Sequence, residues 1–382
     1  MEKKKEITIY EIGILIFIIK IFLGINVFFK TSNLVDNCLI CLACIAIIVS
    51  YWHKRYSKKR LLFIIISTFI LAFFSKRVDN YYFFISWLII CRIDKNNFQR
   101  IIKLIYKIEV ILVIFIMVMS IIYLIFDYKI DLLFSYRRGI KAFNFGFVHP
   151  NLFSTILVNI LNMWIWLNYN RITKKVYVYL FIINICNYYF TKTRTSFIIF
   201  NFLLFMIFVI KNYNQKFLKV ILKFFSKYLF FTLGFTVALL THLYLENNKI
   251  SLIVNKILTG RIKLATYALV NYKYTFLGQF INFKINWDPI FKLNNFTFDC
   301  LYSQLFFNFG VIWFMFLSFS FYKISKKLDE RSTILLIIWC LYGITEIHGI
   351  LCFFGFQILF LGLIFKENNQ NLLLYEGEKW KI

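Results

Sequence analysis

The chain has 382 residues, of which 60% are hydrophobic, 21% aromatic and 16% charged, and its formal net charge is +27. A soluble domain is nearer half apolar and a quarter charged. The composition therefore excludes a soluble globule, a disordered chain, a coiled coil and a secreted disulfide scaffold. The apolar runs are continuous rather than alternating, which argues against an outer-membrane barrel and for membrane-spanning helices.

Taken in chain order, the apolar runs predict an all-α, polytopic membrane protein with about twelve (ten to twelve) transmembrane helices. The first run is expected to be a retained span, because it is too long for a signal-peptide core and lacks a small-residue cleavage site. We expect one transmembrane domain over residues 1–382, with one large extracytoplasmic loop at 246–299. The predicted spans lie near 10–29, 34–51, 61–75, 80–91, 104–126, 151–168, 176–190, 196–210, 226–245, 301–322, 332–346 and 350–365.

Most of the positive charge follows the positive-inside rule, so it indicates topology rather than nucleic-acid binding. Basic clusters fall in alternate loops, which predicts a multi-pass protein of the cytoplasmic membrane with both termini in the cytoplasm. Three outer segments, 127–150, 191–195 and 246–299, nevertheless carry Lys and Arg. Positive charge on the outer face favours an anionic ligand there, although ordinary surface charge or a misplaced span would also account for it.

The cysteines indicate neither a disulfide framework nor a metal site. Cys38, Cys41 and Cys44 have metal-like spacing, but they lie within an apolar run with no fourth ligand nearby. Small residues on a membrane helix explain this spacing better. We therefore expect no metal and no cofactor.

The most informative segment runs from Arg137 to Asn151, where basic residues precede His149 and Pro150. Proline suits the first turn of a helix, so a helix is predicted to start at Pro150 with its positive dipole end outward. A helix start preceded by arginines is typical of a phosphate site. His149 is interpreted as a general base or hydrogen-bond donor, or simply as a helix cap.

A second polar segment, residues 191–196, joins two apolar runs. Thr195 or Ser196 is predicted to cap the following helix, which places Arg194 beside another outward dipole end. Hydroxyls, a guanidinium and free amides together suit a pyrophosphate. A capped hairpin with solvated charges is the alternative interpretation.

Three further groups lie toward the carboxyl end. Apolar residues at helical spacing follow Gly260 and Arg261, which predicts an amphipathic helix on the membrane surface. Asp299, Tyr302 and Gln304 open the next span. Asp299 and Tyr302 are candidate ligand-binding residues, and ordinary capping and interfacial anchoring is the alternative for all three. Glu346 and His348 lie near the outer end of the eleventh span. They are interpreted as a general base with an orienting partner, or as a polar contact between helices.

Together these segments resemble the bacterial oligosaccharide repeat-unit polymerases, the Wzy-type enzymes of O-antigen, capsule and exopolysaccharide synthesis. The resemblance covers roughly residues 137–365 and rests on Asn144 to Asn151, Thr193 to Ser196, Thr259 to Arg261, Asp299 to Tyr302 with Gly310, and Glu346. It departs from the family where Gly-x-Gly is replaced by Gly278-Gln279-Phe280 and where Asp-Asn is replaced by Asp299-Cys300.

The resemblance implies a lipid-carrier glycosyltransferase fold that extends glycan chains held on undecaprenyl pyrophosphate. The growing chain moves onto the incoming lipid-linked unit, and the carrier pyrophosphate leaves. Because pyrophosphate is a good leaving group, fixed positive charge and a base for the acceptor hydroxyl would suffice. Arg138, Arg194 and Arg261 are the diphosphate candidates, and His149 or Glu346 is the candidate base.

The candidate catalytic residues are His149, Arg194, Arg261 and Glu346. The candidate substrate-binding residues are Arg137, Arg138, Lys141, Asn151, Thr195, Asp299, Tyr302 and His348. The expected partners are the undecaprenyl-pyrophosphate-linked oligosaccharide and membrane lipid, with a chain-length regulator and a flippase as candidate protein partners and no nucleic acid.

Three other functions remain open. A lipid-linked glycan ligase shares the many-helix plan and differs only in its acceptor. A flippase of the lipid-linked unit should show two similar halves and short loops, neither of which is visible. An acyltransferase that modifies surface glycan also fits many spans and a histidine.

Overall fold

The computed structural model describes residues 7–52, 54, 56–78, 81–128, 130–137, 139–213, 216–283, 291, 293 and 296–364. Helices account for 78% of the structure, which agrees with a helical membrane protein. The chain divides into two compact units, each built from segments that are distant in sequence. Unit 1 comprises Met1–Lys58 and Leu88–Phe205, and unit 2 comprises Lys59–Trp87 and Met206–Ile382.

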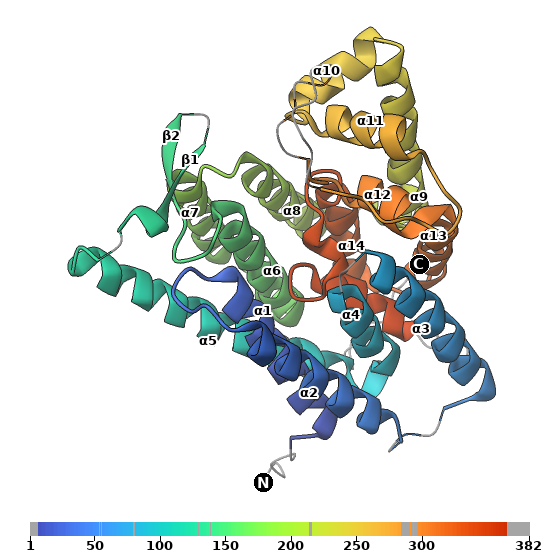
Figure 1. Cartoon of the computed structure of the whole chain (residues 1–382), viewed down its shortest axis with the longest axis horizontal. Coiled ribbons are helices and arrows are strands. Elements are labelled where there is room, and N and C mark those ends of the chain that lie inside the picture. The colour runs from blue at the N-terminus through green and yellow to red at the C-terminus, as the bar shows by residue number, and fades with distance from the viewer. Residues whose placement is uncertain are drawn as a thin grey trace. The chain divides into compact units, whose positions relative to one another are not determined.

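Figure 1 shows the elements in chain order. Unit 1 contains α1 (Ile9–Ile25), α2 (Asn33–Trp52), α5 (Lys95–Ile125), β1 (Phe134–Arg137), β2 (Ile140–Phe143), α6 (Pro150–Asn168) and α7 (Lys174–Thr191). Unit 2 contains α9 (Lys216–Leu245), α10 (Lys249–Ile257), α11 (Arg261–Tyr272), α12 (Leu301–Gln304), α13 (Gly310–Ser325) and α14 (Glu330–Tyr342). Residues of both units occur in α3 (Lys58–Val78), α4 (Tyr81–Arg92) and α8 (Arg194–Tyr213).

Six helices in the described part of the chain are long and apolar enough to cross a membrane. Two of them, Pro150–Arg171 and Leu301–Ser325, are 72% and 67% buried in the protein. The other four leave most of their apolar surface uncovered: only 17% of the apolar window of α2 and 22% of that of α9 is buried. Such surfaces suit contact with lipid tails. The six are Asn33–Trp52, Lys95–Ile125, Pro150–Arg171, Arg194–Tyr213, Phe217–Leu245 and Leu301–Ser325. The expected total of twelve spans stays a prediction.

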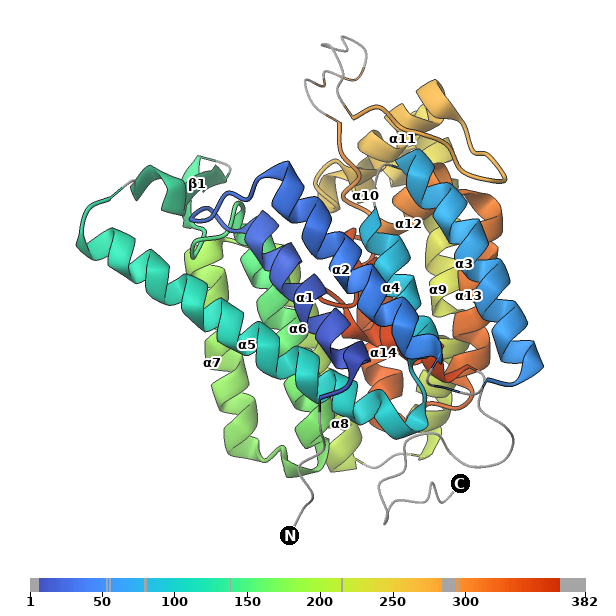
Figure 2. The ribbon, with the colours of Figure 1, turned by 60° about the horizontal axis from the view of Figure 1, so that its bottom comes forward.

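Unit 1 is held together by polar contacts between apolar helices. Figure 2 shows α1 between α2 and α5. The buried Glu11 of α1 pairs with Arg100 of α5 through two contacts. Deeper in the bundle, the fully buried Glu109 of α5 accepts hydrogen bonds from the Asn159 amide of α6, with nitrogen–oxygen distances of 3.2 and 3.4 Å. These contacts fix which faces of α1, α5 and α6 meet.

A β-hairpin precedes α6, although the sequence predicted only helices and loops. Strands β1 and β2 pair antiparallel, from Phe134 opposite Phe143 to Arg137 opposite Ile140. The paired aromatic rings of Phe134 and Phe143 lie 5.2 Å apart, and Gly139 at the turn has a φ of +76°. Cross-strand aromatic pairs stabilise such ribbons. The hairpin packs against α7, so its packing supports the strand pairing.

In unit 2 the predicted span near 301–322 contains a break. Residues Leu305–Phe309 form a π-helical turn between α12 and α13. The chain at Thr275 and Phe276 crosses this break, and its carbonyls accept the amides of Val311 and Ile312 at 3.0 and 3.2 Å. These contacts satisfy the first amides of α13, which would otherwise lack partners.

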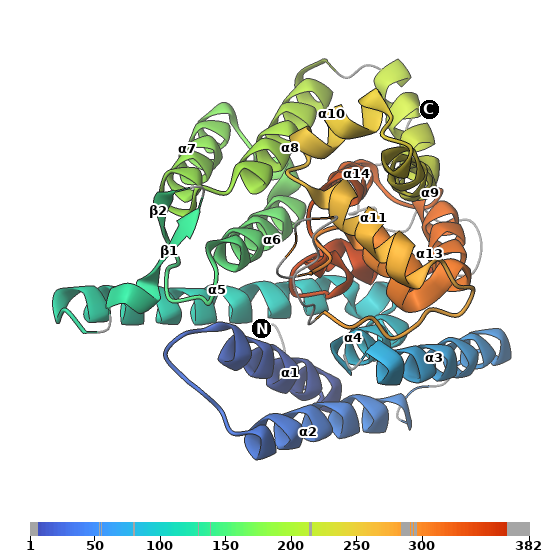
Figure 3. The ribbon, with the colours of Figure 1, turned by 45° about the horizontal axis from the view of Figure 1, so that its top comes forward.

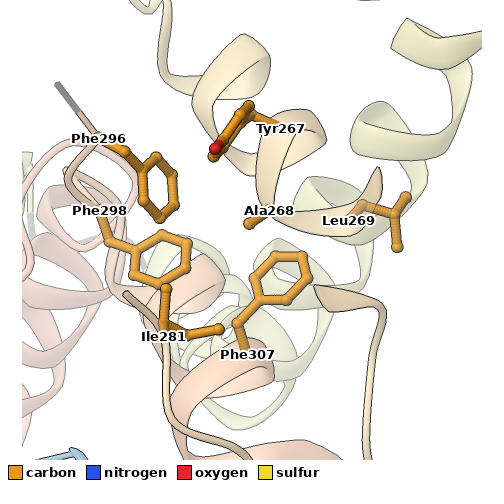
Figure 4. Close-up of a cluster of buried hydrophobic side chains, with 7 residues drawn as sticks. All are labelled: Tyr267, Ala268, Leu269, Ile281, Phe296, Phe298 and Phe307. Atoms are coloured by element: carbon orange, nitrogen blue, oxygen red, sulfur yellow. The ribbon is translucent and has the colours of Figure 1, made fainter. Parts of the chain in front are cut away.

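The predicted helix after Gly260 is present as α11, but the expectation that its apolar face lies against the membrane is wrong, because that face packs against protein. Its apolar residues Ile262, Ala265 and Ala268 are buried within unit 2. Figure 4 shows α11 contributing to an aromatic cluster that also contains Phe298 and Phe307, whose stacked rings are 5.6 Å apart. Periodicity identified an apolar face but could not distinguish a protein partner from lipid.

An α-helical span near 350–365 was also predicted, and this prediction is wrong for the described residues. The segments His348–Ile350 and Phe356–Leu363 are 3₁₀-helical, with turns between them. Gly349 and Gly355 both approach the Trp339 indole, whose Nε1–H donates to the Gly349 carbonyl at 3.0 Å. Glycines at such close contacts interrupt the helix, although the surrounding residues are apolar.

Candidate functional site

The sequence correctly predicted that α6 begins at Pro150. His149 is the N-cap, with extended backbone, and its Nδ1 accepts the Asn151 amide at 3.2 Å. Because Nδ1 is an acceptor, the neutral ring carries its proton on Nε2. His149 is exposed, so it is accessible for either of its predicted roles.

Helix α8 begins at Arg194, and the prediction that Thr195 or Ser196 caps it is wrong. Lys192 has the left-handed φ of 56° that ends α7, and the Thr193 carbonyl accepts the Phe197 amide in the first turn of α8. The helix therefore starts two residues earlier than a cap at Thr195 would allow. Thr195, half-buried, lies within the first turn.

Hydroxyl and amide groups tie the amino-terminal ends of α6 and α8 together. Thr193 Oγ1 donates to Ser154 Oγ at 2.7 Å, and the Asn187 amide donates to the same oxygen at 2.7 Å. Thr191 Oγ1 lies 2.6 Å from Thr193 Oγ1. We call these four buried residues the hydroxyl cluster. Since Ser154 is one turn into α6 and Thr193 directly precedes α8, the cluster holds two positive dipole ends close together.

Arg194 and Lys192 lie at the start of α8, and Lys141 lies on the hairpin that packs against α7; none of the three pairs with a carboxylate in the part of the chain that the structure describes. Arg194 is exposed at the positive end of α8, where a cation opposes the helix dipole. Lys192 lies over the Tyr189 ring at 4.6 Å, and Lys141 lies over the Phe134 ring at 4.0 Å. The arrangement is electrostatically suited to an anion.

The remaining candidates of this segment are less constrained. Arg137 ends β1, and nothing is described of its side chain, while Arg138 lies outside the described residues. Lys141 is exposed on β2. Asn151 is the second residue of α6 and is half-buried.

In unit 2, Arg261 is the first residue of α11 and is 9% exposed. Its Nε and Nη2 donate to the Thr345 carbonyl at 3.1 and 2.8 Å, and Nε also reaches the Asp299 carbonyl at 3.3 Å. Nη1 donates to the Leu258 carbonyl at 3.0 Å and to Thr259 Oγ1 at 2.6 Å. One guanidinium thus joins three segments that are far apart in sequence.

No carboxylate within the described ranges forms an ion pair with Arg261. Neutral oxygens of the described residues accept from four of its five N–H groups, and the second N–H of Nη2 has no acceptor among those residues. Its field reaches the neighbouring thiol: burial raises the pKa of Cys300, and the Arg261 charge acts against that rise. Arg261 is therefore both a structural bridge and a source of positive potential.

Replacing Arg261 with alanine should lower the stability of unit 2 by about 3 kcal/mol, because buried carbonyls lose a charged donor. The Arg261→Lys variant keeps the charge but not the planar set of donors, so an intermediate loss is expected. Thermal unfolding of the detergent-solubilised protein measures the effect. Lys263→Ala, which removes one cation from the same helix, is the matched control, and an equal melting temperature in both alanine variants would contradict the bridging role.

The other unit 2 candidates differ in accessibility. Asp299 is exposed, and its carboxylate accepts from Thr297 Oγ1 at 3.4 Å. Tyr302 is fully buried, and its hydroxyl donates to the Cys340 carbonyl at 2.8 Å, which is a contact within the core. Glu346 is buried and directly follows Thr345, so it adjoins the Arg261 bridge in sequence. His348 opens a 3₁₀ segment, and nothing is described of its side chain.

Two polar residues that are not among the candidate site residues lie at the helix break; the sequence analysis noted Gln304 only as a residue that opens the span, and did not note Asn308. Gln304 Oε1 and both amide atoms of Asn308 are buried and have no hydrogen-bond partner within the described structure. Unpaired amides are costly in an apolar bundle. Their spacing of four residues and the nearby Gly310 were the only signals in the sequence.

The candidate residues thus fall into two groups, each placed by its own unit. His149, Asn151, Arg194 and Thr195 lie at the joined ends of α6 and α8, and Arg261, Asp299 and Glu346 lie around the bridge at the start of α11. Comparison of the chain with protein-family models, curated proteins and solved structures finds no match.

Proposed function

We propose that this protein polymerises oligosaccharide repeat units linked to undecaprenyl pyrophosphate at the outer face of the cytoplasmic membrane, with both termini in the cytoplasm. The bond between the growing chain and its carrier diphosphate breaks, and a glycosidic bond forms to a hydroxyl of the incoming unit. The diphosphate leaves on its lipid, and the hydroxyl proton passes to a base.

The observation that carries the proposal is the pairing of the amino-terminal ends of α6 and α8 by the hydroxyl cluster. Two positive dipole ends and the exposed Arg194 lie together, with no carboxylate partner among the described residues. A diphosphate supplies the negative charge that such an arrangement favours. The long apolar helices supply the setting in which its isoprenoid tail is soluble.

The proposed roles follow from the local geometry. Arg194 and the first amides of α6 and α8 hold the diphosphate and stabilise the charge that develops on it. His149 donates from Nε2 to a phosphate or sugar oxygen. Arg261 contributes positive potential in unit 2, and Glu346 is the candidate base there. Arg137, Arg138, Lys141, Asn151, Thr195, Asp299 and His348 remain the proposed substrate-binding residues, whereas the buried Tyr302 is assigned to the core of unit 2.

The test is a reconstituted reaction. The purified protein in lipid vesicles is given lipid-linked repeat units extracted from its source cells, and products are separated by length. We expect a ladder of products longer than one unit and one free undecaprenyl pyrophosphate for each bond formed. Transfer only to a different, added acceptor would indicate a ligase, and transbilayer movement without new bonds would indicate a flippase; either outcome would contradict the proposal.

A further inference from the structure

Helix α10 exposes an apolar stripe bordered by lysines. Ile250, Ile253 and Ile257 are 64%, 57% and 72% exposed, and their spacing places them on one face of the helix. Lys249 and Lys256 are also exposed on this side. The exposed face of α10 therefore consists of isoleucine and lysine. Exposure of three isoleucines to water is unfavourable, which indicates that this face contacts an apolar surface.

The opposite face of α10 is fixed to the protein, which determines where the stripe points. Ser251 is completely buried and donates to the Asn248 carbonyl at 2.7 Å. Asn255 Oδ1 accepts the Lys263 amide at 2.9 Å, which ties α10 to the first turn of α11. Figure 3 shows the two helices side by side. The isoleucines are thus presented outward by a fixed helix.

The position of α10 in the chain brings it to the membrane boundary. Helix α9 has 30 residues and is among the helices able to cross a membrane. At 1.5 Å per residue it is about 45 Å long, whereas the hydrocarbon core is about 30 Å thick. Only residues 246–248 separate α9 from α10. A helix that starts so soon after a span of this length begins in the headgroup region.

We propose that α10 lies in the surface of the lipid bilayer, with Ile250, Ile253 and Ile257 inserted below the headgroups. Lys249 and Lys256 then contact the phosphates of anionic lipids. Because α10 is bonded to the first turn of α11, this contact also fixes the depth at which Arg261 lies relative to the bilayer surface. The proposal is independent of the reaction that the protein catalyses and of the side on which α10 lies.

Site-directed spin labelling tests the depth of the stripe. Ile253→Cys is labelled in a background in which the exposed Cys38, Cys41 and Cys186 are replaced by serine, and the protein is placed in nanodiscs with anionic lipid. We expect collisions of the label with oxygen to exceed those with a water-soluble nickel complex severalfold. The reverse ratio is expected at the exposed Glu246→Cys, the control site just before α10.

Two results at Ile253→Cys would overturn the proposal. Accessibility to nickel equal to that at Glu246→Cys would place the stripe in water. Poor accessibility to both reagents would mean that protein, such as a second copy of this chain, covers the stripe. Thermal unfolding of the labelled variant, which must match the unlabelled background, excludes misfolding as the cause of either result.

The role of the lysines is tested by lipid composition. We expect the Ile253→Cys label to lie deeper in anionic than in zwitterionic nanodiscs, and this difference should vanish when Lys249→Gln and Lys256→Gln are combined. Equal depth in both lipids with the lysines present would overturn the assignment of anionic headgroups as their ligands.

Discussion

Replacing Arg194 with alanine is expected to lower the rate of polymer formation by about a hundredfold to a thousandfold, the effect typical of losing one preorganised electrostatic group. Arg194 is exposed and forms no ion pair within the described structure, so its loss should leave folding intact. Arg194→Lys keeps a point charge but loses bidentate geometry, and about a tenfold loss is expected from it. Product length and amount in reconstituted vesicles measure the effect.

The matched control is Arg171→Ala. Arg171 is likewise exposed and lies in the short 3₁₀ turn that follows the carboxyl end of α6, at the opposite end of that helix from His149. This variant removes the same charge and should leave the polymer unchanged. Polymer of normal length and amount from Arg194→Ala would contradict the proposed diphosphate site, even if Arg261→Ala proved inactive because unit 2 is destabilised.

Replacing Gly278 with alanine should destabilise unit 2 by about 3 kcal/mol or more, because overpacking adds to backbone strain. Gly278 has a φ of +71°, and an added Cβ would overlap the backbone carbonyl of Asn308. Gly310, with a φ of +85°, meets the backbone of Gly278 in the same way. Since both obstacles are backbone atoms, no side-chain rotation relieves the clash, and the chain crossing at the π-helical turn must separate.

Gly139→Ala separates the two contributions. Gly139 has a similar φ of +76°, but nothing lies within 4 Å of an added Cβ, so only strain of about 1 kcal/mol is expected. Thermal unfolding in detergent compares the variants. Equal melting temperatures for Gly278→Ala and Gly139→Ala would show that the chains at the break are not in contact.

Local signals in the sequence predicted the start of α6 well. Proline has no amide proton, and a residue in the first turn of a helix does not need one for an intrahelical hydrogen bond. Its ring also holds φ near the helical value, so the first turn is the position in a helix that suits Pro150 best. The helix after Gly260 was predicted for a similar reason, because apolar spacing and a permissive glycine both indicate a helix start there. In each case the residues that determine where the helix starts lie within one turn of that start.

Features that depend on distant residues were not predicted. Thr193, rather than Thr195, precedes α8 because its hydroxyl reaches Ser154, which is 39 residues earlier in the chain. The apolar face of α11 packs against Phe298 and Phe307 rather than lipid, and the periodicity of the sequence does not indicate which residues cover that face. The π-helical turn at 305–309 likewise depends on the chain that crosses it at Gly278. The sequence of 301–322 taken alone therefore predicts an unbroken span.

The Glu109–Asn159 pair limits how α5 can turn about its own axis. Lipid tails are as apolar as isoleucine, so the aliphatic residues of α5 gain little from facing protein rather than membrane. A carboxyl group facing hydrocarbon would cost several kcal/mol, and the Asn159 amide would lose its acceptor as well. The Glu109–Asn159 contact thus selects one rotational orientation of α5. The Glu11–Arg100 pair then fixes the orientation of α1 relative to α5.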